Sequence, residues 1–208
     1  MTISSAAVLD DPVAGLRVAI TGGTSGLGLA LVRELVSRGA RVAFVARTRE
    51  RVEQVAKENP GAHGIVADVS KKEDIYPMAI QITGELGGLD VLINNASSLG
   101  PTPLRLLSDT ECEDLEDVFA ANLFGPFRLT KALMGALAAS AREGRGAMVL
   151  NVISDAGISA YPHWGAYGAS KWALRGLSKT AAMDPIKLAT RTSSIEDKGV
   201  FMPGCPSR

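Results

Sequence analysis

Cysteine is nearly absent from this sequence, which has only Cys112 and Cys205 in 208 residues. Two cysteines are too few for a disulfide framework and lack the spacing of a zinc site, so a reducing compartment fits the chain best. His63 and His163 are the only histidines, and neither stands in a cluster of possible ligands. The sequence therefore predicts a protein without disulfides and without a bound metal.

An excess of charge of one sign is also missing, because 22 Lys and Arg balance 22 Asp and Glu. A formal net charge of zero removes the electrostatic argument for a nucleic-acid binder or an anionic-membrane binder. No apolar run approaches the roughly 20 residues of a membrane span, and residues 1–15 do not have the pattern of a signal peptide. We therefore expect a cytoplasmic protein with a small-molecule ligand and with no nucleic-acid or membrane partner.

What the sequence does contain is a repeated alternation of short apolar runs and helical patterns. Hydrophobic residues make up 46% of the chain, which is enough for one domain with a buried core. Segments with helical spacing of apolar residues separate the apolar runs at 16–21, 41–46, 64–67, 89–94 and 147–153. This alternation predicts a doubly wound parallel sheet between helices, the three-layer α/β/α Rossmann fold.

The pattern also divides the chain. After Pro185 the apolar residues are scattered and predict no long strand or helix. We therefore expect an N-terminal tail over residues 1–15, one Rossmann domain over residues 16–185 and an irregular tail over residues 186–208.

The turn after the first apolar run is rich in glycine and reads TGGTSGLG over residues 21–28. Gly22 can make a sharp turn, Gly26 lets the backbone approach a ligand, and Gly28 permits close packing of helix against strand. A helix N-terminus then faces the ligand's phosphate groups. Because the spacing is not the general G-x-G-x-x-G, a glycine-rich turn without a ligand is the alternative. The residues predicted to bind a dinucleotide here are Gly22, Thr24, Ser25, Gly26, Leu27 and Gly28.

A basic segment, Ala46-Arg47-Thr48-Arg49, follows the second apolar run. An NAD site normally offers an acidic residue at this place, whereas a guanidinium can bind the 2′-phosphate of NADP. Arg47, with Thr48 as a second donor, therefore favours NADP(H) over NAD(H). The alternatives are a merely solvated Arg47 and, for Arg49 and Arg51, exposed positions on the following helix.

Tyr167 and Lys171 stand four residues apart in YGASK, and so on one face of a predicted helix. An ammonium near the phenol favours its deprotonated form, so we expect the pKa of Tyr167 to fall and its hydroxyl to exchange a proton near neutral pH. Ser154, at the end of the fifth apolar run, can hydrogen-bond the same substrate oxygen. A Tyr–Lys pair without a catalytic role is the alternative.

Together these features resemble the short-chain dehydrogenase/reductase family, in its Tyr-x-x-x-Lys branch. The resemblance covers about residues 16–182. Its matches, in chain order, are TGGTSGLG, Asp68-Val69, Asn94-Asn95-Ala96, Asn122 in ANLFGPF, Ser154 in NVISDAG, and YGASK. It implies an NADP(H)-dependent oxidoreductase that interconverts a carbonyl and a secondary alcohol by hydride transfer. It also implies a homodimer or homotetramer formed through residues 122–141 and 164–182, which an intramolecular core would explain nearly as well.

The resemblance implies a role for each matching residue. Tyr167 would be the general acid in carbonyl reduction and the base in the reverse direction. Lys171 would bind the nicotinamide ribose and stabilise the phenolate, and Ser154 would orient the substrate oxygen. Asn122 would hold a water that connects Lys171 to solvent. The remaining cofactor contacts would be Asp68 and Val69 at the adenine, and Asn95 and Ala96 along the cofactor.

The chain departs from the family pattern at Ser97 and near its end. Ser97 stands where the family commonly has glycine after Asn-Asn-Ala. The family usually continues with a sixth strand, a Pro-Gly turn, a substrate loop and a seventh strand, and here Pro203-Gly204 is the candidate for that turn. We therefore expect a chain shortened at its C-terminus, with the sixth position of the sheet open. The alternative function is a truncated or variant member that binds nucleotide, or a full-length partner, with little turnover.

Overall fold

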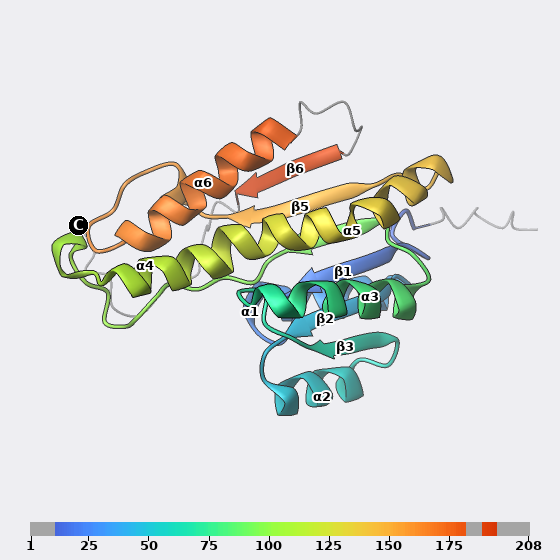
Figure 1. Ribbon diagram of the computed structural model, residues 1–208. Helices are drawn as coiled ribbons and strands as arrows, with labels where there is room; N and C mark the ends of the chain where they lie inside the picture. Colours follow the sequence, from blue (N-terminus) through green and yellow to red (C-terminus); the bar gives the residue numbers. More distant parts are fainter. Residues whose placement is uncertain (1–10, 182–188, 195–208) are drawn as a thin grey trace, which may run out of the picture.

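A six-stranded parallel sheet forms the centre of the computed structural model, which describes residues 11–181 and 189–194 (Figure 1). The strand order is β3-β2-β1-β4-β5-β6, and every neighbouring pair is parallel. The strands are β1 (Arg17–Thr21), β2 (Arg41–Ala46), β3 (Ala62–Val66), β4 (Val91–Asn94), β5 (Met148–Ile153) and β6 (Ala189–Ser194). The order reverses between β1 and β4, as in a doubly wound sheet, so the predicted fold class is confirmed.

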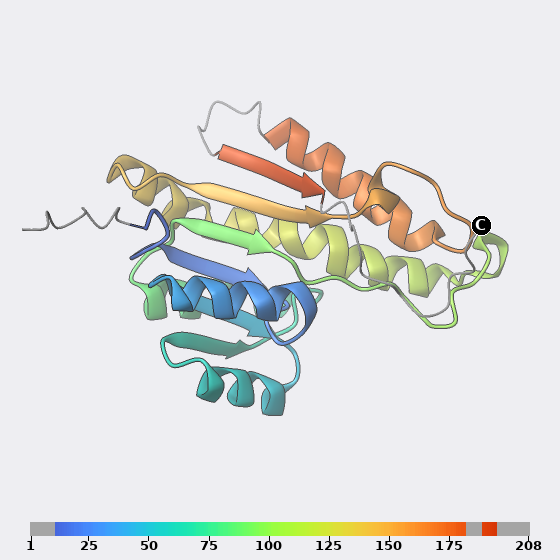
Figure 2. The same cartoon turned by 180° about the vertical axis from the view of Figure 1, so that it is seen from behind.

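Helices cover both faces of the sheet, with α1 and α2 on one side and α3, α5 and α6 on the other (Figures 1 and 2). The α-helices are α1 (Gly26–Ser37), α2 (Arg49–Glu58), α3 (Ile75–Leu86), α4 (Cys112–Phe119), α5 (Gly125–Arg142) and α6 (Gly165–Ala181). Short 3-10 turns are η1 (Lys72–Asp74), η2 (Leu107–Asp109) and η4 (Asp155–Gly157), and η3 (Ala120–Phe124) is a π-helix between α4 and α5.

Two hydrophobic clusters join these layers. Residues spaced four apart along α5 lie on one face of the helix, and there Leu129, Leu133 and Leu137 are buried against α3 and the sheet. On the opposite face of the sheet, Val32 of α1 and Val52 of α2 pack on the strand residues. With both faces covered, the strands carry continuous apolar runs, as parallel strands usually do.

The expectation that residues 186–208 are irregular is wrong for Ala189–Ser194. This segment is strand β6, which pairs in parallel with β5 from Met148↔Ala189 to Ile153↔Ser194. The sixth position of the sheet is therefore filled, and the domain boundary expected at residue 185 comes too early. The segment reads ATRTSS, so it lacks the apolar run by which the other strands were predicted. The Pro203-Gly204 turn lies outside the described residues.

Candidate active site

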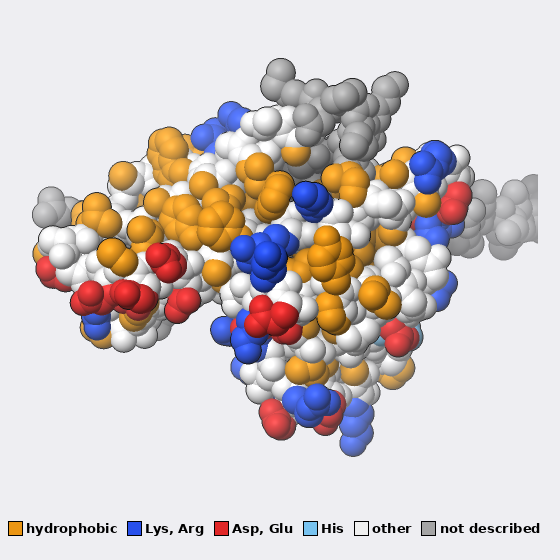
Figure 3. Space-filling view, viewed as in Figure 1, with side chains coloured by type: hydrophobic (Ala, Val, Ile, Leu, Met, Phe, Trp, Pro, Cys, Tyr) orange, Lys and Arg blue, Asp and Glu red, His pale blue; other side chains and the backbone are white. Residues whose placement is uncertain are grey.

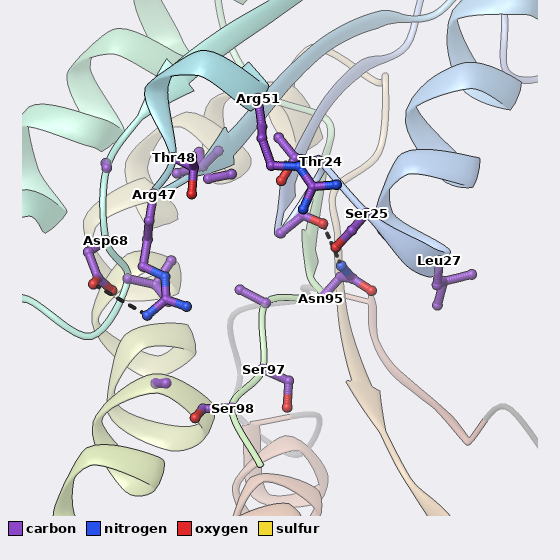
Figure 4. Close-up of a pocket in the computed structure, with 17 residues that line it drawn as sticks. Thr24, Ser25, Leu27, Arg47, Thr48, Arg51, Asp68, Asn95, Ser97 and Ser98 are labelled. Atoms are coloured by element: carbon purple, nitrogen blue, oxygen red, sulfur yellow. Dashed lines mark hydrogen bonds and ion pairs between the residues drawn. The ribbon is translucent and has the colours of Figure 1, made fainter. Parts of the chain in front are cut away.

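A cleft of about 420 Å³ opens beside the carboxyl ends of β1, β2 and β4, where the strand order reverses (Figure 4). Ligands of doubly wound sheets bind at such a switch point. Most of the predicted cofactor residues line it, namely Gly22, Thr24, Ser25, Leu27, Arg47, Thr48, Asp68, Val69, Asn95 and Ala96. The fold thus brings together segments that were predicted separately along the chain.

The glycine-rich turn has the geometry that its sequence predicts. Gly22 has a φ of +72°, in the left-handed region that favours glycine. A Cβ atom at Gly28 would collide with the carbonyl oxygen of Gly22 and with the amide of Asn95. Gly26 and Gly28 are not among the residues that line the cleft, but Ser25 lines it and precedes α1, so the helix N-terminus begins at the cleft.

Asn95 ties this turn to the end of β4. Its Nδ2 atom donates to the carbonyl oxygens of Thr21 and Gly22, at 3.0 and 3.2 Å. The backbone N–H groups of Asn95 and Ala96 both donate to Thr21 Oγ1 at 3.0 Å. Asn95 therefore fixes the shape of the glycine-rich turn, in addition to lining the cleft.

Arg47 and Asp68 form an ion pair at one side of the cleft, where Arg47 Nη1 lies 4.0 Å from Asp68 Oδ2 (Figure 4). The Arg47 side chain is 76% exposed, so it is free to turn towards a ligand. Asp68 is held in place by Ser70, whose backbone N–H and hydroxyl donate to Asp68 Oδ1 at 2.9 and 2.7 Å. A guanidinium at this edge of the cleft is suited to an anionic group.

Arg51 is a cleft residue to which the sequence analysis gave too little weight. It lies on α2, lines the cleft, and extends towards Thr24 (Figure 4). Arg47 precedes α2, which begins at Arg49, so helical spacing does not relate the two arginines and no local pattern marks Arg51 as a cleft residue. Arg49 does not line the cleft and instead lies 3.7 Å from Glu53.

Lys171 and Tyr167 lie together on α6, as their spacing predicts. The Lys171 side chain is buried, and its Nζ atom donates to the Val152 carbonyl oxygen at 2.9 Å. The same Nζ atom lies 5.6 Å from the centre of the Tyr167 ring. Burial lowers the pKa of Lys171 to about 8. The ammonium is therefore easily neutralised and is directed at a backbone carbonyl.

The expected fall in the pKa of Tyr167 is wrong for this structure. Burial raises the pKa of the phenol, while the side chains of Ser154 and Ser97 act in the opposite direction without cancelling the rise. Ser154 also donates to Asp155 Oδ1 at 2.9 Å, and the negative charge of Asp155 raises the Tyr167 pKa further. The sequence showed the neighbouring lysine but not the burial of the phenol.

Asn122, in the π-helix η3, is fully buried and has every polar atom of its side chain occupied. Its Nδ2 atom donates to the Ser98 carbonyl oxygen at 2.8 Å and to Ser170 Oγ at 3.0 Å. Its Oδ1 atom accepts from the Ser98 N–H at 2.7 Å and from the Ser97 hydroxyl at 3.2 Å. These four hydrogen bonds use both donors and both acceptor sites of the side-chain amide, and the water expected at Asn122 stays a prediction.

Aromatic rings surround the phenol on its other side. Trp164 meets Tyr167 edge to face, with ring centres 5.4 Å apart, and Tyr161 meets Trp164 in the same way at 6.5 Å. A separate hollow is lined in part by Leu104, His163 and Tyr167. Tyr167 therefore lines this hollow and is not among the residues that line the cleft beside β1, β2 and β4.

Residues 11–181 and 189–194 contain no group of three or more His, Cys, Asp or Glu side chains placed to hold a metal ion. Among the described helices, none has the length and hydrophobicity needed to cross a membrane.

Known proteins are similar to this chain over most of its length. The family described as short chain dehydrogenase matches residues 17–196. An uncharacterized oxidoreductase of Mycobacterium bovis is 37% identical over 194 residues, which cover 90% of this chain and 55% of that protein. The 2-(R)-hydroxypropyl-CoM dehydrogenase of Xanthobacter autotrophicus is 33% identical over 185 residues, or 86% of this chain and 72% of that protein. This chain spans about half the length of its mycobacterial relative.

Solved structures share the fold. The 3-ketoacyl-(acyl-carrier-protein) reductase from Brucella melitensis, complexed with NADH, has a TM-score of 0.82 and 26% identity over 88% of this chain and 76% of that chain. An alcohol dehydrogenase from Thermococcus sibiricus, complexed with 5-hydroxy-NADP, has a TM-score of 0.77 and 28% identity over 85% of this chain and 74% of that chain. With its parallel sheet, glycine-rich turn and Tyr-x-x-x-Lys helix, this chain belongs to the short-chain dehydrogenase family.

Proposed function

We propose that this chain interconverts a carbonyl compound and a secondary alcohol by NADP(H)-dependent hydride transfer, with Tyr167 as general acid and base. One observation carries the proposal. Tyr167 and Lys171 lie together on α6, with Lys171 Nζ 5.6 Å from the centre of the Tyr167 ring, in a fold whose cleft residues suit a dinucleotide. A phenol placed in this way can exchange a proton with a substrate oxygen at the moment of hydride transfer.

The cleft residues fit a dinucleotide. A side chain at Gly28 would push the Gly22 carbonyl out of place, so the close turn at the α1 N-terminus depends on glycine at this position. That N-terminus suits a pyrophosphate, because its free N–H groups and dipole favour an anion. Arg47 and Arg51 suit a 2′-phosphate at the neighbouring edge, which supports NADP(H) over NAD(H). When bound, the nicotinamide would give or accept the hydride.

The chain's own residues manage the proton. In reduction, Tyr167 donates its hydroxyl proton to the carbonyl oxygen, and Ser154 donates a hydrogen bond to the same oxygen. Because burial raises the pKa of Tyr167, the phenol stays protonated at neutral pH. A protonated phenol is the form that a general acid needs in carbonyl reduction.

The proposal is tested by measuring NADPH and NADH binding together with turnover of a panel of carbonyl compounds. We expect tighter binding of NADPH and measurable consumption of NADPH with at least one carbonyl compound. Binding of NADPH without any turnover would instead support a nucleotide-binding chain that needs a partner for catalysis. Absence of binding to either nucleotide would contradict both functions.

We also propose that the chain forms a homodimer or homotetramer through helices α5 and α6. Large hydrophobic side chains are exposed on these elements and on the adjoining η3, among them Phe124, Phe127 and Trp172, which are 44%, 46% and 51% exposed. Figure 3 shows hydrophobic side chains gathered over this face. A patch of this kind typically marks an interface. Light scattering should show a dimer or tetramer at micromolar concentration, and a monomer alone would contradict the proposal.

A cytoplasmic location is a further proposal. Cys112 is an exposed free thiol, which persists best in a reducing compartment. Cell fractionation of the tagged protein should find it with cytoplasmic markers, and recovery elsewhere would contradict this location.

A further inference from the structure

The small hollow beside Tyr167 has an apolar part and a charged part. Leu99 and Leu104 belong to its apolar lining, and Arg105 and Asp114 belong to its charged lining. Its volume is about 30 Å³, and since one water needs roughly 10–15 Å³, it has room for a group of about two or three non-hydrogen atoms. The phenol therefore shares a space the size of a carboxylate group with one guanidinium and one carboxylate.

Packing of a loop against α6 brings Arg105 to this hollow. The loop joins β4 to α4 and carries Leu107, whose Cδ1 atom would lie 2.9 Å from a Cβ atom added at Gly165. Gly165 is the first residue of α6, and Tyr167 follows in the same turn of the helix. The contact between Leu107 and Gly165 therefore holds the segment that contains Arg105 beside the segment that contains the phenol.

The guanidinium of Arg105 is only loosely held. Its Nη1 atom lies 3.8 Å from Asp114 Oδ2, which is too far for a hydrogen bond, and its side chain is 51% exposed. Arg38, by comparison, donates two hydrogen bonds of 2.8 Å to Asp11. Arg105 therefore keeps N–H donors for a ligand, and a guanidinium presents them in a fork that matches a carboxylate.

The two charged groups of the hollow would select opposite substrates, because Arg105 suits a carboxylate and Asp114 suits an ammonium group. The side chain of Asp114 is 24% exposed, so the guanidinium is the more accessible of the two. The other carboxylates of α4 are exposed and do not line the hollow, so water and salt weaken their repulsion of an anion; they are Glu113, Glu116 and Asp117. The geometry thus favours an anionic group at Arg105.

We propose that Arg105 binds the carboxylate of the substrate, and that the substrates are short aliphatic oxo acids whose carbonyl oxygen lies at Tyr167. This inference rests on the proposed function. Leu99 and Leu104 would contact the methylene groups between the carbonyl and the carboxylate. The carboxylate is unchanged in the reaction, in which the carbonyl carbon takes the hydride of the nicotinamide and the carbonyl oxygen takes the proton of Tyr167. Arg105 thus determines specificity by holding one end of the substrate while the other end reacts.

The test compares two oxo acids, 4-oxopentanoate and 5-oxohexanoate, with their methyl esters. An ester keeps the carbonyl and the carbon chain but lacks the negative charge, so the ratio of kcat/KM for acid and ester measures recognition of the carboxylate. We expect the wild type to prefer at least one acid roughly ten- to a hundredfold, as hydrogen bonds to charged groups typically provide. Equal use of acids and esters by the wild type would overturn the proposal. Faster use of an amino ketone of equal length would show that Asp114 selects the substrate, and would also overturn it.

Substitutions of Arg105 assign the preference to this residue. Arg105→Met removes the guanidinium and should bring the ratio close to one, whereas Arg105→Lys keeps the charge without the fork and should retain part of the preference. Asp114→Asn removes the competing carboxylate and should increase the preference. Arg142→Met, at an exposed position of α5, is the matched control and should keep the wild-type ratio. A preference that persists in Arg105→Met would contradict the role of Arg105.

Binding measured without turnover separates this inference from the proposed function. The chain has two tryptophans, and in the Trp172→Phe variant the fluorescence reports Trp164, whose ring centre lies 5.4 Å from that of Tyr167. Titration of this variant, with and without Arg105→Met, gives the dissociation constants of acid and ester in the presence of NADP⁺. Circular dichroism and the NADPH dissociation constant establish that each variant is folded.

The two measurements together decide between the outcomes. A preference for binding the acid that is lost in Arg105→Met, in a chain without turnover, would support the role of Arg105 while contradicting the proposed function. Reduction of acids and esters with equal kcat/KM would overturn the role of Arg105 and leave the proposed function standing.

Discussion

The ammonium of Lys171 lies against the ring of Tyr167, with Nζ 5.6 Å from the ring centre, and donates to the Val152 carbonyl oxygen at 2.9 Å. Their four-residue spacing on α6 accounts for this closeness. Burial nevertheless shifts both groups towards their neutral forms, because it raises the pKa of Tyr167 and lowers that of Lys171 to about 8. Burial thus opposes the phenolate form that a neighbouring ammonium would otherwise favour.

Tyr167→Phe removes the transferable proton and little else. Because the phenol is a general acid in the proposed reaction, we expect turnover to fall by about 10²- to 10⁴-fold. The ring still packs against Trp164, so the NADPH dissociation constant should stay near that of the wild type. Parallel NADPH binding and carbonyl-reduction assays measure both effects. Retained turnover in the variant would exclude Tyr167 as the proton donor.

Arg47→Asp should change the choice between nucleotides. It places a carboxylate where the 2′-phosphate of NADPH is proposed to bind, so NADPH affinity should fall about ten- to a hundredfold while NADH affinity changes little. Arg51→Ala should weaken NADPH in the same selective way, to a smaller extent. The measurement is the dissociation constant of each nucleotide for each variant.

Arg49→Asp is the matched control for this prediction. Arg49 is next to the same strand end but lies beside Glu53 instead of lining the cleft, so its substitution should leave the ratio of NADPH to NADH affinity nearly unchanged. If Arg47→Asp weakens both nucleotides equally, Arg47 does not recognise the 2′-phosphate.

Much of the fold could be predicted from the sequence because parallel strands that are buried on both faces leave continuous apolar runs. In β2, for example, Val42, Ala43, Phe44 and Val45 are all buried. Strand β6 left no such run, because its sequence ATRTSS is polar and its pairing with β5 is made by the backbone. A strand of this kind is found only when its neighbour is known.

The candidate site, like the fold, could be predicted from the sequence only in part. Local spacing predicted Tyr167 and Lys171 on one helix face. The place of Arg51 at the cleft could not be predicted in this way, because Arg47 precedes α2 and helical spacing does not relate the two arginines. The contact between Ser97 and Asn122 joins residues 25 apart in the sequence, across a loop whose path no local pattern gives. The pKa of Tyr167 depends on burial, which spacing does not reveal.

Asp90→Asn should destabilise the fold far from the cleft. Burial alone would raise the pKa of Asp90, but hydrogen bonds from Arg145, Arg17 and Ser140 hold it well below its usual range. The carboxylate therefore stabilises the folded chain above about pH 4, and this contribution is lost as the pH falls towards the folded pKa. Removing one partner of a buried ion pair costs about 3–5 kcal/mol, which urea unfolding near neutral pH would measure. Asp117→Asn, at an exposed position of α4, should cost much less, and equal costs would contradict this role of Asp90.

Lys171→Met should stabilise the chain while abolishing turnover. The folded pKa of Lys171 is about 8, below its ordinary value of 10.5, so between these values the unfolded chain binds more protons than the folded chain. Wild-type stability from this group therefore rises as the pH increases from about 8 to about 10, and at neutral pH the buried ammonium costs on the order of 3 kcal/mol. Methionine fills the same space without a charge, and after loss of the hydrogen bond to Val152 a net gain in stability of about 1–2 kcal/mol remains.

Urea unfolding of Lys171→Met and of the wild type at several pH values should show this gain near neutral pH and its disappearance towards pH 10. Lys179→Met, at an exposed position near the end of α6, should show no such pH-dependent difference, and a Lys171→Met variant that is less stable than wild type at neutral pH would contradict the argument.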